Sequence, residues 1–189
     1  MTNTSRSYFE ELYLQSPDPW GFATKWYERR KYSLTVASLP RERYGRAFEP
    51  GCSIGVLTEM LARRCDEVVS FEMIPSALEQ ARLRLAAQPH VSLELACVPQ
   101  DWPAKVFDLV VLSEIAYYFD KTTLSDVVER VLRTTSQGAT VVAVHWRGQT
   151  DYPLSGDEAH EIIDSAEELT RVVEHREELI ALDVWERRS

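Results

Sequence analysis

Glu49-Pro50-Gly51-Cys52-Ser53-Ile54-Gly55 is a short loop sequence between an apolar segment and a helical pattern. Gly51 and Gly55 allow the backbone to turn sharply and to approach a ligand closely, and Ser53 is small enough to do the same. In open parallel sheets, ligands bind at the carboxyl ends of the strands, where such strand-to-helix loops lie. We therefore expect residues 49–55 to form the centre of a ligand site in an α/β fold.

Three ligand classes use a loop of this kind, and its residues distinguish between them. A dinucleotide site needs G-x-G-x-x-G, but Ser53 and Val56 stand where two further glycines belong. A phosphate-binding loop needs a Gly-Lys pair, which does not occur in the sequence. The methyltransferase pattern, an acid followed by x-G-x-G-x-G, is met at Glu49, Gly51 and Gly55, with Ser53 replacing the middle glycine. The loop, Cys52 included, therefore predicts a site for S-adenosylmethionine.

Two acidic residues agree with this interpretation. Glu49 would repel a pyrophosphate, whereas it would accept charge-assisted hydrogen bonds from the ammonium group of an amino acid tail. Glu72 ends the next predicted strand, where the two oxygens of a carboxylate can accept both ribose hydroxyls. We expect Glu72 and the adjacent Met73 to contact the nucleoside.

Apolar segments and helical patterns alternate along most of the chain, which predicts a parallel, doubly wound sheet. The expected strands are 46–49, 67–72, 91–96, 107–112 and 139–145, and the expected helices are 26–39, 54–64, 75–87, 124–134 and 157–166. Segments 169–174 and 178–185 leave no room for a helix between them, so they should pair as an antiparallel hairpin. The expected fold class is therefore α/β and Rossmann-like, with a seven-stranded, mostly parallel sheet and a C-terminal antiparallel hairpin.

Length and composition set the broad class. The 189 residues, 44% of them hydrophobic, fit a single domain over 1–189, which we divide into a helical lid at 1–40 and a core at 41–189. A net charge of −9, from 30 acids and 21 bases, argues against a nucleic acid or an anionic membrane as the partner. No apolar run approaches the ~20 residues of a spanning helix, and the polar N-terminus is unlike a secretory signal. Cys52, Cys65 and Cys97 are expected to be reduced thiols in a cytoplasmic protein.

Residues that follow the fourth and fifth strands should face the methyl group, so we seek the catalytic groups there. Glu114, beside Ser113, could accept a hydrogen bond from an acceptor amine, or it could be an acid favoured by a helix dipole. Tyr117 and Tyr118 follow by about one helical turn, so one should face the cleft and the other should pack inward. His145, at the end of the fifth strand, is the first candidate for a general base. The sequence has no His or Cys pattern typical of a metal site, so no metal is expected.

Two further expectations concern residues beside the cleft. His160, at the start of a helix, could close over the cleft. The leading helix, 26–39, should turn aromatic residues inward and its charged residues outward.

Several blocks of sequence resemble one family of bacterial methyltransferases. F-E-P-G-C-S-I-G-V-L-T at 48–58, F-D-L-V-V-L-S-E-I-A-Y-Y at 107–118, H-W-R-G at 145–148 and D-P-W at 18–20 are similar to the NodS-like relatives of the rhizobial nodulation N-methyltransferase. The resemblance runs from about residue 18 to about residue 160. It implies the class I methyltransferase fold, S-adenosylmethionine as cofactor and a small polar acceptor. In the nodulation enzyme that acceptor is the amine of a chitin-like oligosaccharide.

One position departs from the family pattern. Relatives usually carry Asp after the third strand, facing the adenine amino group, whereas this chain has Cys97. Backbone groups of Val98, or the nearby Asp101, are expected to replace that contact. Trp102 either walls the pocket or anchors the loop.

The sequence thus favours a methyltransferase that acts on the amine of an amino sugar or chitooligosaccharide-like molecule. Three alternatives stay open: an O-methyltransferase of another small metabolite, a nucleotide-dependent oxidoreductase and a non-catalytic methyltransferase-like binding module. The acceptor and the oligomeric state are not determined, because acceptor pockets are built from variable loops.

Overall fold

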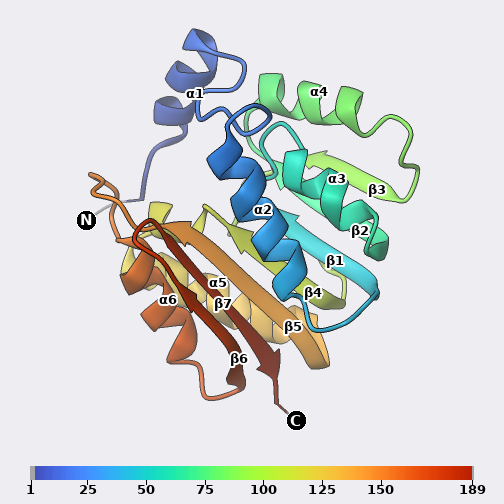
Figure 1. Cartoon of the computed structure of the whole chain (residues 1–189), viewed down its shortest axis with the longest axis vertical. Coiled ribbons are helices and arrows are strands. Elements are labelled where there is room, and N and C mark those ends of the chain that lie inside the picture. Colours follow the sequence, from blue (N-terminus) through green and yellow to red (C-terminus); the bar gives the residue numbers. More distant parts are fainter. Residues whose placement is uncertain (1–2, 189) are drawn as a thin grey trace.

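The computed structural model describes residues 3–188, and within this range seven strands form one sheet (Figure 1). The strands follow the spatial order β3-β2-β1-β4-β5-β7-β6. Their bounds are β1 Tyr44–Pro50, β2 Cys65–Glu72, β3 Val91–Leu95, β4 Phe107–Ser113, β5 Thr135–Trp146, β6 Leu169–Arg176 and β7 Ile180–Arg187. The first five strands are parallel, whereas β7 runs antiparallel to both β5 and β6. The predicted α/β sheet with its C-terminal hairpin is confirmed.

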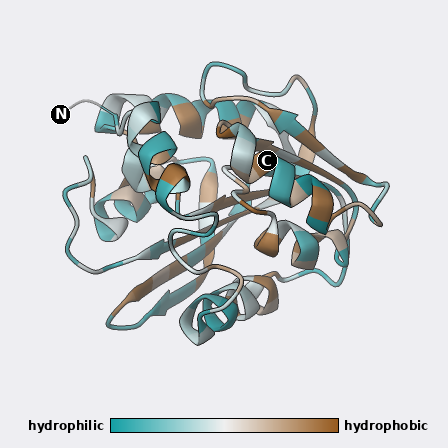
Figure 2. Ribbon diagram, turned by 90° about the horizontal axis from the view of Figure 1, so that it is seen from above, coloured by the Kyte–Doolittle hydropathy of each residue, from teal (hydrophilic) through white to brown (hydrophobic). Residues whose placement is uncertain are grey.

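Helices cover both faces of this sheet, with α2, α3 and α4 on one face and α5 and α6 on the other (Figure 1). The helices are α1 Arg6–Gln15, α2 Trp26–Ser38, α3 Val56–Ala62, α4 Pro75–Arg84, α5 Lys121–Thr134 and α6 Gly156–Asp164. A short 3-10 helix, η1, spans Ala116–Tyr118 and was not expected from the sequence. Hydrophobic strands cross the middle of the molecule between helices of mixed polarity (Figure 2). The core therefore consists of two layers, one on each side of the sheet.

Strand β4 shows why the chain folds this way. Leu109 and Val111 belong to the core layer under α2 and α3, whereas Val110 and Leu112 belong to the layer under α5 and α6. Successive side chains of a strand point to opposite faces, so a strand covered on both faces must be apolar throughout. The near-continuous apolar run that the sequence shows at 107–112 is the consequence.

Helix α5 follows from its periodicity and its N-terminal cap. Its four buried residues, Leu124, Val127, Val128 and Val131, have the spacing of one helical face. The side chain of Asp120 accepts a hydrogen bond from the backbone N–H of Thr123 at 2.8 Å and so starts the helix at Lys121, three residues earlier than expected.

Within residues 3–188 we find no helix with the length and apolar character that crossing a bilayer requires.

Gly55 is the residue on which the packing of α3 against α4 depends. It caps α3 in the left-handed conformation, with φ of 79°, and a Cβ there would lie 3.1 Å from both Ala81 and Leu85. Both the backbone angle and the close approach of α4 therefore require glycine.

We expect Gly55→Ala to destabilise the fold by about 2 kcal/mol, which lowers the melting temperature by roughly 4–8 °C. Gly138→Ala is the matched control, because Gly138 has a similar φ of 72° but only Arg41 nearby, at 3.5 Å. Thermal unfolding followed by circular dichroism measures both variants. Equal losses in the two variants would show that crowding against α4 contributes nothing.

Candidate active site

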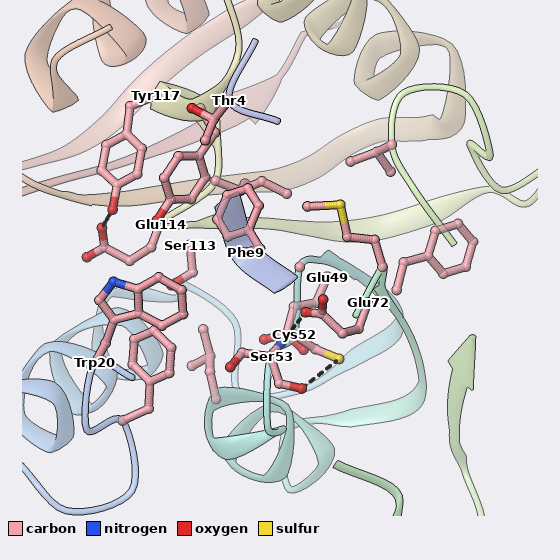
Figure 3. A pocket seen from close by; sticks show the side chains of 18 of the residues that line it. Thr4, Phe9, Trp20, Glu49, Cys52, Ser53, Glu72, Ser113, Glu114 and Tyr117 are labelled. Atoms are coloured by element: carbon pink, nitrogen blue, oxygen red, sulfur yellow. Dashed lines mark hydrogen bonds between the residues drawn. The ribbon is translucent and has the colours of Figure 1, made fainter. Parts of the chain in front are cut away.

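The carboxyl ends of β1, β2 and β4 open into a cavity of about 590 Å³. Strand β1 lies between β2 and β4, so the connections that follow β1 and β4 leave the sheet in opposite directions at this point. Such a switch point is where open α/β sheets bind ligands. Figure 3 shows the side chains around this cavity, with Glu49, Glu72, Cys52 and Ser53 gathered on one side and Glu114 with Tyr117 on the other.

Glu72 anchors the first side of the cavity. Its Oε2 accepts a hydrogen bond from the backbone N–H of Ser53 at 2.8 Å, and its Oε1 accepts one from Ile74 at 2.8 Å. Burial raises the pKa of this carboxyl, and the backbone N–H groups offset part of the rise. Since each carboxylate oxygen has two lone pairs, Glu72 retains acceptor capacity toward the cavity.

Glu49 lies beside Glu72 and is buried, although it lines the same cavity. Its Oε2 accepts hydrogen bonds from the hydroxyls of Thr58 at 2.6 Å and Ser70 at 2.9 Å. Burial raises the pKa of Glu49 to about 7, against the opposing effect of the two hydroxyls. Glu49 can therefore gain or lose its charge near neutral pH.

The loop between β1 and α3 presents its backbone to the cavity. Gly51 has a φ of 75°, and a Cβ there would lie 3.0 Å from the side chain of Ile115. Ser53 also has a left-handed φ, of 51°, which is unusual for a residue with a side chain. Its hydroxyl hydrogen-bonds to that of Tyr13 in α1. The loop is thus held in a constrained shape between α1 and Glu72.

The segment after β3 lies at the same side of the cavity. Cys97 and Val98 line the cavity, whereas Asp101 accepts a hydrogen bond from the backbone N–H of Cys97 at 2.8 Å and does not line it. Trp102 packs against Phe48, with ring centroids 5.1 Å apart, and it also lies outside the lining. Of the two expected replacements for the missing Asp, only Val98 lines the cavity, and Trp102 is a loop anchor.

Glu114 dominates the opposite side of the cavity. Its backbone is left-handed, with φ of 54°, and such strain in a residue with a side chain is typical of functional sites. Its Oε2 accepts hydrogen bonds from the Tyr117 hydroxyl and from the backbone N–H of Trp146, the latter at 3.0 Å. Its Oε1 accepts one from Lys31 Nζ at 2.5 Å.

Lys31 is a buried cation, with only 2% of its side chain exposed. Its Nζ also lies 2.7 Å from Glu28 Oε2 and 5.3 Å from the centre of the Tyr27 ring. Burial opposes the charge, but Glu114 and Glu28 outweigh it and raise the pKa of Lys31. With all three groups ionised, two carboxylates surround one cation, so this cluster of three side chains carries one net negative charge, which the nearby Lys25 partly offsets.

The position of Lys31 corrects our expectation for helix α2. We expected its charged residues to face outward, but four positions spaced as one helical face are buried and three of them are polar: Glu28, Lys31, Tyr32 and Thr35. The spacing of 28, 31, 32 and 35 was visible in the sequence as one helical face. The polar character of three of these residues, however, predicted an exposed face.

A group of tyrosines completes this end of the cavity. Tyr117 and Tyr118 both line it, and Tyr117 is at the same time buried in the core layer under α5 and α6. The ring of Tyr152 lies 5.1 Å from that of Tyr117 and 4.7 Å from that of Tyr118. Flat aromatic surfaces next to carboxylates suit an acceptor that is both polar and ring-shaped.

His145 does not reach the cavity, which contradicts its expected role as general base. It is fully buried, and its Nε2 accepts a hydrogen bond from the backbone N–H of Ala116 at 3.0 Å. Its Nδ1 lies 2.9 Å from Nε2 of His160, which is also buried and so does not close over the cleft. Both nitrogens of His145 are engaged inside the protein, so it has no access to a substrate.

The structure brings together most of the residues singled out in the sequence. The following predicted residues line the cavity: Glu49, Gly51, Cys52, Ser53, Glu72, Met73, Val98, Ser113, Glu114 and Tyr117. Gly55 does not line it, because it acts as the cap of α3. Lining residues to which the sequence reasoning gave no site role include Phe9, Tyr13, Trp20, Glu28, Lys31 and Tyr152, although all but Tyr152 lie in the predicted lid at 1–40.

The strand order, the C-terminal hairpin and the placement of the cavity define the class I S-adenosylmethionine-dependent methyltransferase fold. The sequence profile of one family, Nodulation protein S (NodS), matches residues 5–178. The chain belongs to the NodS family.

Solved structures and curated relatives agree with this assignment. The crystal structure of N-methyltransferase NodS from Bradyrhizobium japonicum WM9 in complex with S-adenosyl-l-homocysteine shares the fold, with a TM-score of 0.86 and 24% identity over 99% of this chain and 100% of that chain. A Pseudomonas syringae protein assigned as a methyltransferase is 42% identical, with a TM-score of 0.77 over 86% of this chain and 100% of that chain.

Nodulation protein S from Bradyrhizobium diazoefficiens is 32% identical over 68% of this chain. The protein of the same name from Rhizobium tropici is 30% identical, also over 68%. The matched region spans 60% and 55% of the lengths of these two relatives.

The pKa of Glu49 leads to a prediction about stability. In the unfolded chain a glutamate titrates near ~4.3, whereas in the fold the neutral form of Glu49 is favoured up to about pH 7. This contribution to stability is full below the unfolded pKa and is lost as the pH rises through about 7. The stability of Glu49→Gln relative to the unsubstituted protein should therefore increase between pH 5 and pH 8.

Urea unfolding at several pH values measures this difference. Glu67→Gln, on the neighbouring strand β2, is the control, because Lys105 and Arg46 lower the pKa of Glu67, which is the opposite direction. Its stability difference should stay flat over the same interval. A Glu49→Gln difference that is constant from pH 5 to pH 8 contradicts a raised pKa.

Proposed function

We propose that the chain is an S-adenosylmethionine-dependent methyltransferase that acts on the amine of a small polar acceptor, an amino sugar or a short chitooligosaccharide. One observation carries the proposal: a single cavity at the switch point has a strained glycine loop with buried carboxylates at one end, and a carboxylate with tyrosines at the other. The first end is suited to a nucleoside with an amino acid tail. The second is suited to a cationic, ring-shaped acceptor.

The residues of the first end fit the methyl donor. The free lone pairs of Glu72 suit the ribose hydroxyls, and Glu49 with the backbone of Gly51 suits the ammonium of the amino acid tail. Met73 and Val98 form apolar walls where adenine would lie. The crystal structure of NodS from B. japonicum in complex with S-adenosyl-l-homocysteine supports this choice of cofactor.

When bound, S-adenosylmethionine supplies a methyl group that its sulfonium already activates. The protein then needs to align the acceptor and exclude water, rather than provide a strong base. Glu114 would hold an N–H of the amine with the lone pair that Lys31, Tyr117 and Trp146 leave free, which directs the nitrogen lone pair toward the methyl carbon. The nitrogen of the neutral amine would take the methyl group as the C–S bond breaks with its electrons on sulfur, and the product ammonium would release its proton to solvent when it leaves.

We propose further that the predicted lid, in its described part 3–40, covers the core at 41–188; residues 1, 2 and 189 of the predicted division lie outside the described residues. Phe9, Tyr13 and Trp20 line the cavity from the N-terminal side. The backbone N–H of Thr4 donates to the carbonyl of Tyr118 at 2.8 Å, so this segment touches the acceptor end as well as the donor end. A cavity covered in this way can exclude water once both ligands have entered.

We expect Glu72→Gln to weaken binding of S-adenosyl-l-homocysteine by about 10- to 100-fold, because the substitution removes charge-assisted hydrogen bonds to the ribose. Isothermal titration calorimetry measures the dissociation constant. Glu67→Gln is the control, since Glu67 lies at the other end of β2 and pairs with Arg46 and Lys105. Unchanged affinity in a folded Glu72→Gln variant would remove Glu72 from the donor site.

A methyl-label transfer assay tests the acceptor. We expect label on glucosamine and on deacetylated chitooligosaccharides but not on their N-acetylated forms, because acetylation removes the basic lone pair. Glu114→Gln should lower kcat/KM for the amine by about tenfold or more while the donor dissociation constant changes by less than about twofold.

The same assay separates the alternatives. Label on the N-acetylated sugars would indicate O-methylation. Donor binding without transfer to any acceptor of this class would indicate a binding module.

A further inference from the structure

Two buried histidines connect the acceptor end of the cavity to the C-terminal hairpin. His145, in β5, lies 2.9 Å from His160 in α6, and Nδ1 of His160 lies 2.6 Å from Oδ2 of Asp183 in β7. All three side chains are almost completely inaccessible to solvent. Arg176 of β6 closes the chain with two hydrogen bonds to Asp183, at 2.8 Å and 2.5 Å.

The hydrogen bonds that link Ala116, His145, His160 and Asp183 have only one consistent donor-to-acceptor direction. The backbone N–H of Ala116 can only donate, so Nε2 of His145 must accept and the proton of the neutral ring must lie on Nδ1. This Nδ1–H then donates to Nε2 of His160, whose own proton lies on Nδ1 and is donated to Asp183. The Ala116 N–H at one end and the carboxylate of Asp183 at the other thus determine the tautomers of both rings.

At the other end, this series of hydrogen bonds reaches η1, the element that carries Tyr117 and Tyr118 of the cavity. Ala116 is the first residue of η1, and the next residue, Tyr117, places its ring 4.9 Å from the ring of His145. The Tyr117 hydroxyl donates to Glu114. His145 therefore contacts the backbone of Ala116 and the side chain of Tyr117, and Tyr117 in turn orients Glu114.

Gly156 allows α6 to come close enough for this contact. A Cβ at Gly156 would lie 2.7 Å from the carbonyl oxygen of Trp146 and 3.1 Å from Cβ of His145. Helix α6 begins at this residue with a capping box formed by Ser155 and Glu158. The N-terminus of α6 is thereby fixed against the end of β5, and His160 lies one turn further along the helix.

We propose that His145, through His160 and Asp183, is a positioning residue for the acceptor: it holds η1 so that Tyr117 and Glu114 meet the amine in one orientation. This inference rests on the proposed function for its kinetic consequence, but not for its structural one. A protonated His145 would carry a hydrogen on Nε2 and face the Ala116 N–H with a second donor, so the neutral ring is required.

The surroundings of His145 keep it neutral. Burial lowers its pKa well below the ordinary value, and His160 and Lys31 add to the effect. The titratable or charged groups around the chain, from each element packed against it, are Lys31 with Glu28 of α2, Glu114, Tyr117 of η1, His160 of α6, Asp183 of β7 and Arg176 of β6. Acceptor kinetics should therefore show no protonation of His145 across the neutral range.

Two substitutions at one position provide the test. In His145→Gln the amide oxygen can still accept from the Ala116 N–H, whereas in His145→Leu nothing can. We expect His145→Gln to keep kcat/KM for the acceptor within about threefold and His145→Leu to lose about tenfold or more. Both variants should bind S-adenosyl-l-homocysteine with nearly unchanged affinity. His90→Gln is the control, because Nε2 of His90 contacts the Ala62 carbonyl on the opposite side of the fold.

Nuclear magnetic resonance tests the same proposal without turnover. In the unsubstituted protein, 15N-labelled histidine should show His145 with a bare Nε2 and a protonated Nδ1. Both variants lose the ring current of the imidazole, so ring signals of labelled Tyr117 should shift in both, but clearly more in His145→Leu than in His145→Gln. A proton on Nε2 of His145, equal losses in the two variants or unchanged acceptor kinetics in a folded His145→Leu overturns the proposal. Absence of any methyl transfer, with these spectra as expected, counts against the proposed function alone.

Discussion

The carboxylate of Glu114 joins three parts of the chain that are far apart in sequence. It accepts hydrogen bonds from Lys31 in α2, from Tyr117 in η1 and from the backbone of Trp146 at the end of β5. A buried ion pair adds little to stability by itself, but removing one partner leaves an uncompensated charge in the interior. The leading helix, the strand ends and the tyrosines must therefore assemble together around this one group.

Buried acids give the cavity its chemical character. Glu49 and Glu72 occupy one end and Glu28 and Glu114 the other, while Lys31 is a buried cation that compensates part of this charge, and Arg6 and Lys25 also line the cavity. Burial raises the pKa of three of these acids, Glu28, Glu49 and Glu72. A cationic ligand would restore the charges that desolvation disfavours. This agrees with the donor proposed above, which has an ammonium tail, at one end and with the proposed amine acceptor at the other.

Some residues of the cavity could be identified only from the structure. Phe9, Tyr13 and Trp20 line the cavity, although they precede the first strand by many residues. Their local sequence is that of an ordinary amphipathic helix and turn, so nothing in it identifies a ligand. His145 presents the reverse case, because a histidine at the carboxyl end of a strand suits a base, yet α6 covers it and occupies both its nitrogens.

By itself the sequence determined the order of strands and helices, the C-terminal hairpin and the loop at Gly51 and Gly55, because local periodicity and backbone conformation decide these features. It also identified Glu49, Glu72 and Glu114, since each stands at a strand end where a parallel sheet binds ligands. Only the tertiary structure decided that Glu28 and Lys31 face inward and that His145 faces away from the cavity. The burial of a polar side chain depends on partners from distant segments, such as Glu114 for Lys31 and Asp183 for the histidines. The local sequence around a residue does not identify such partners.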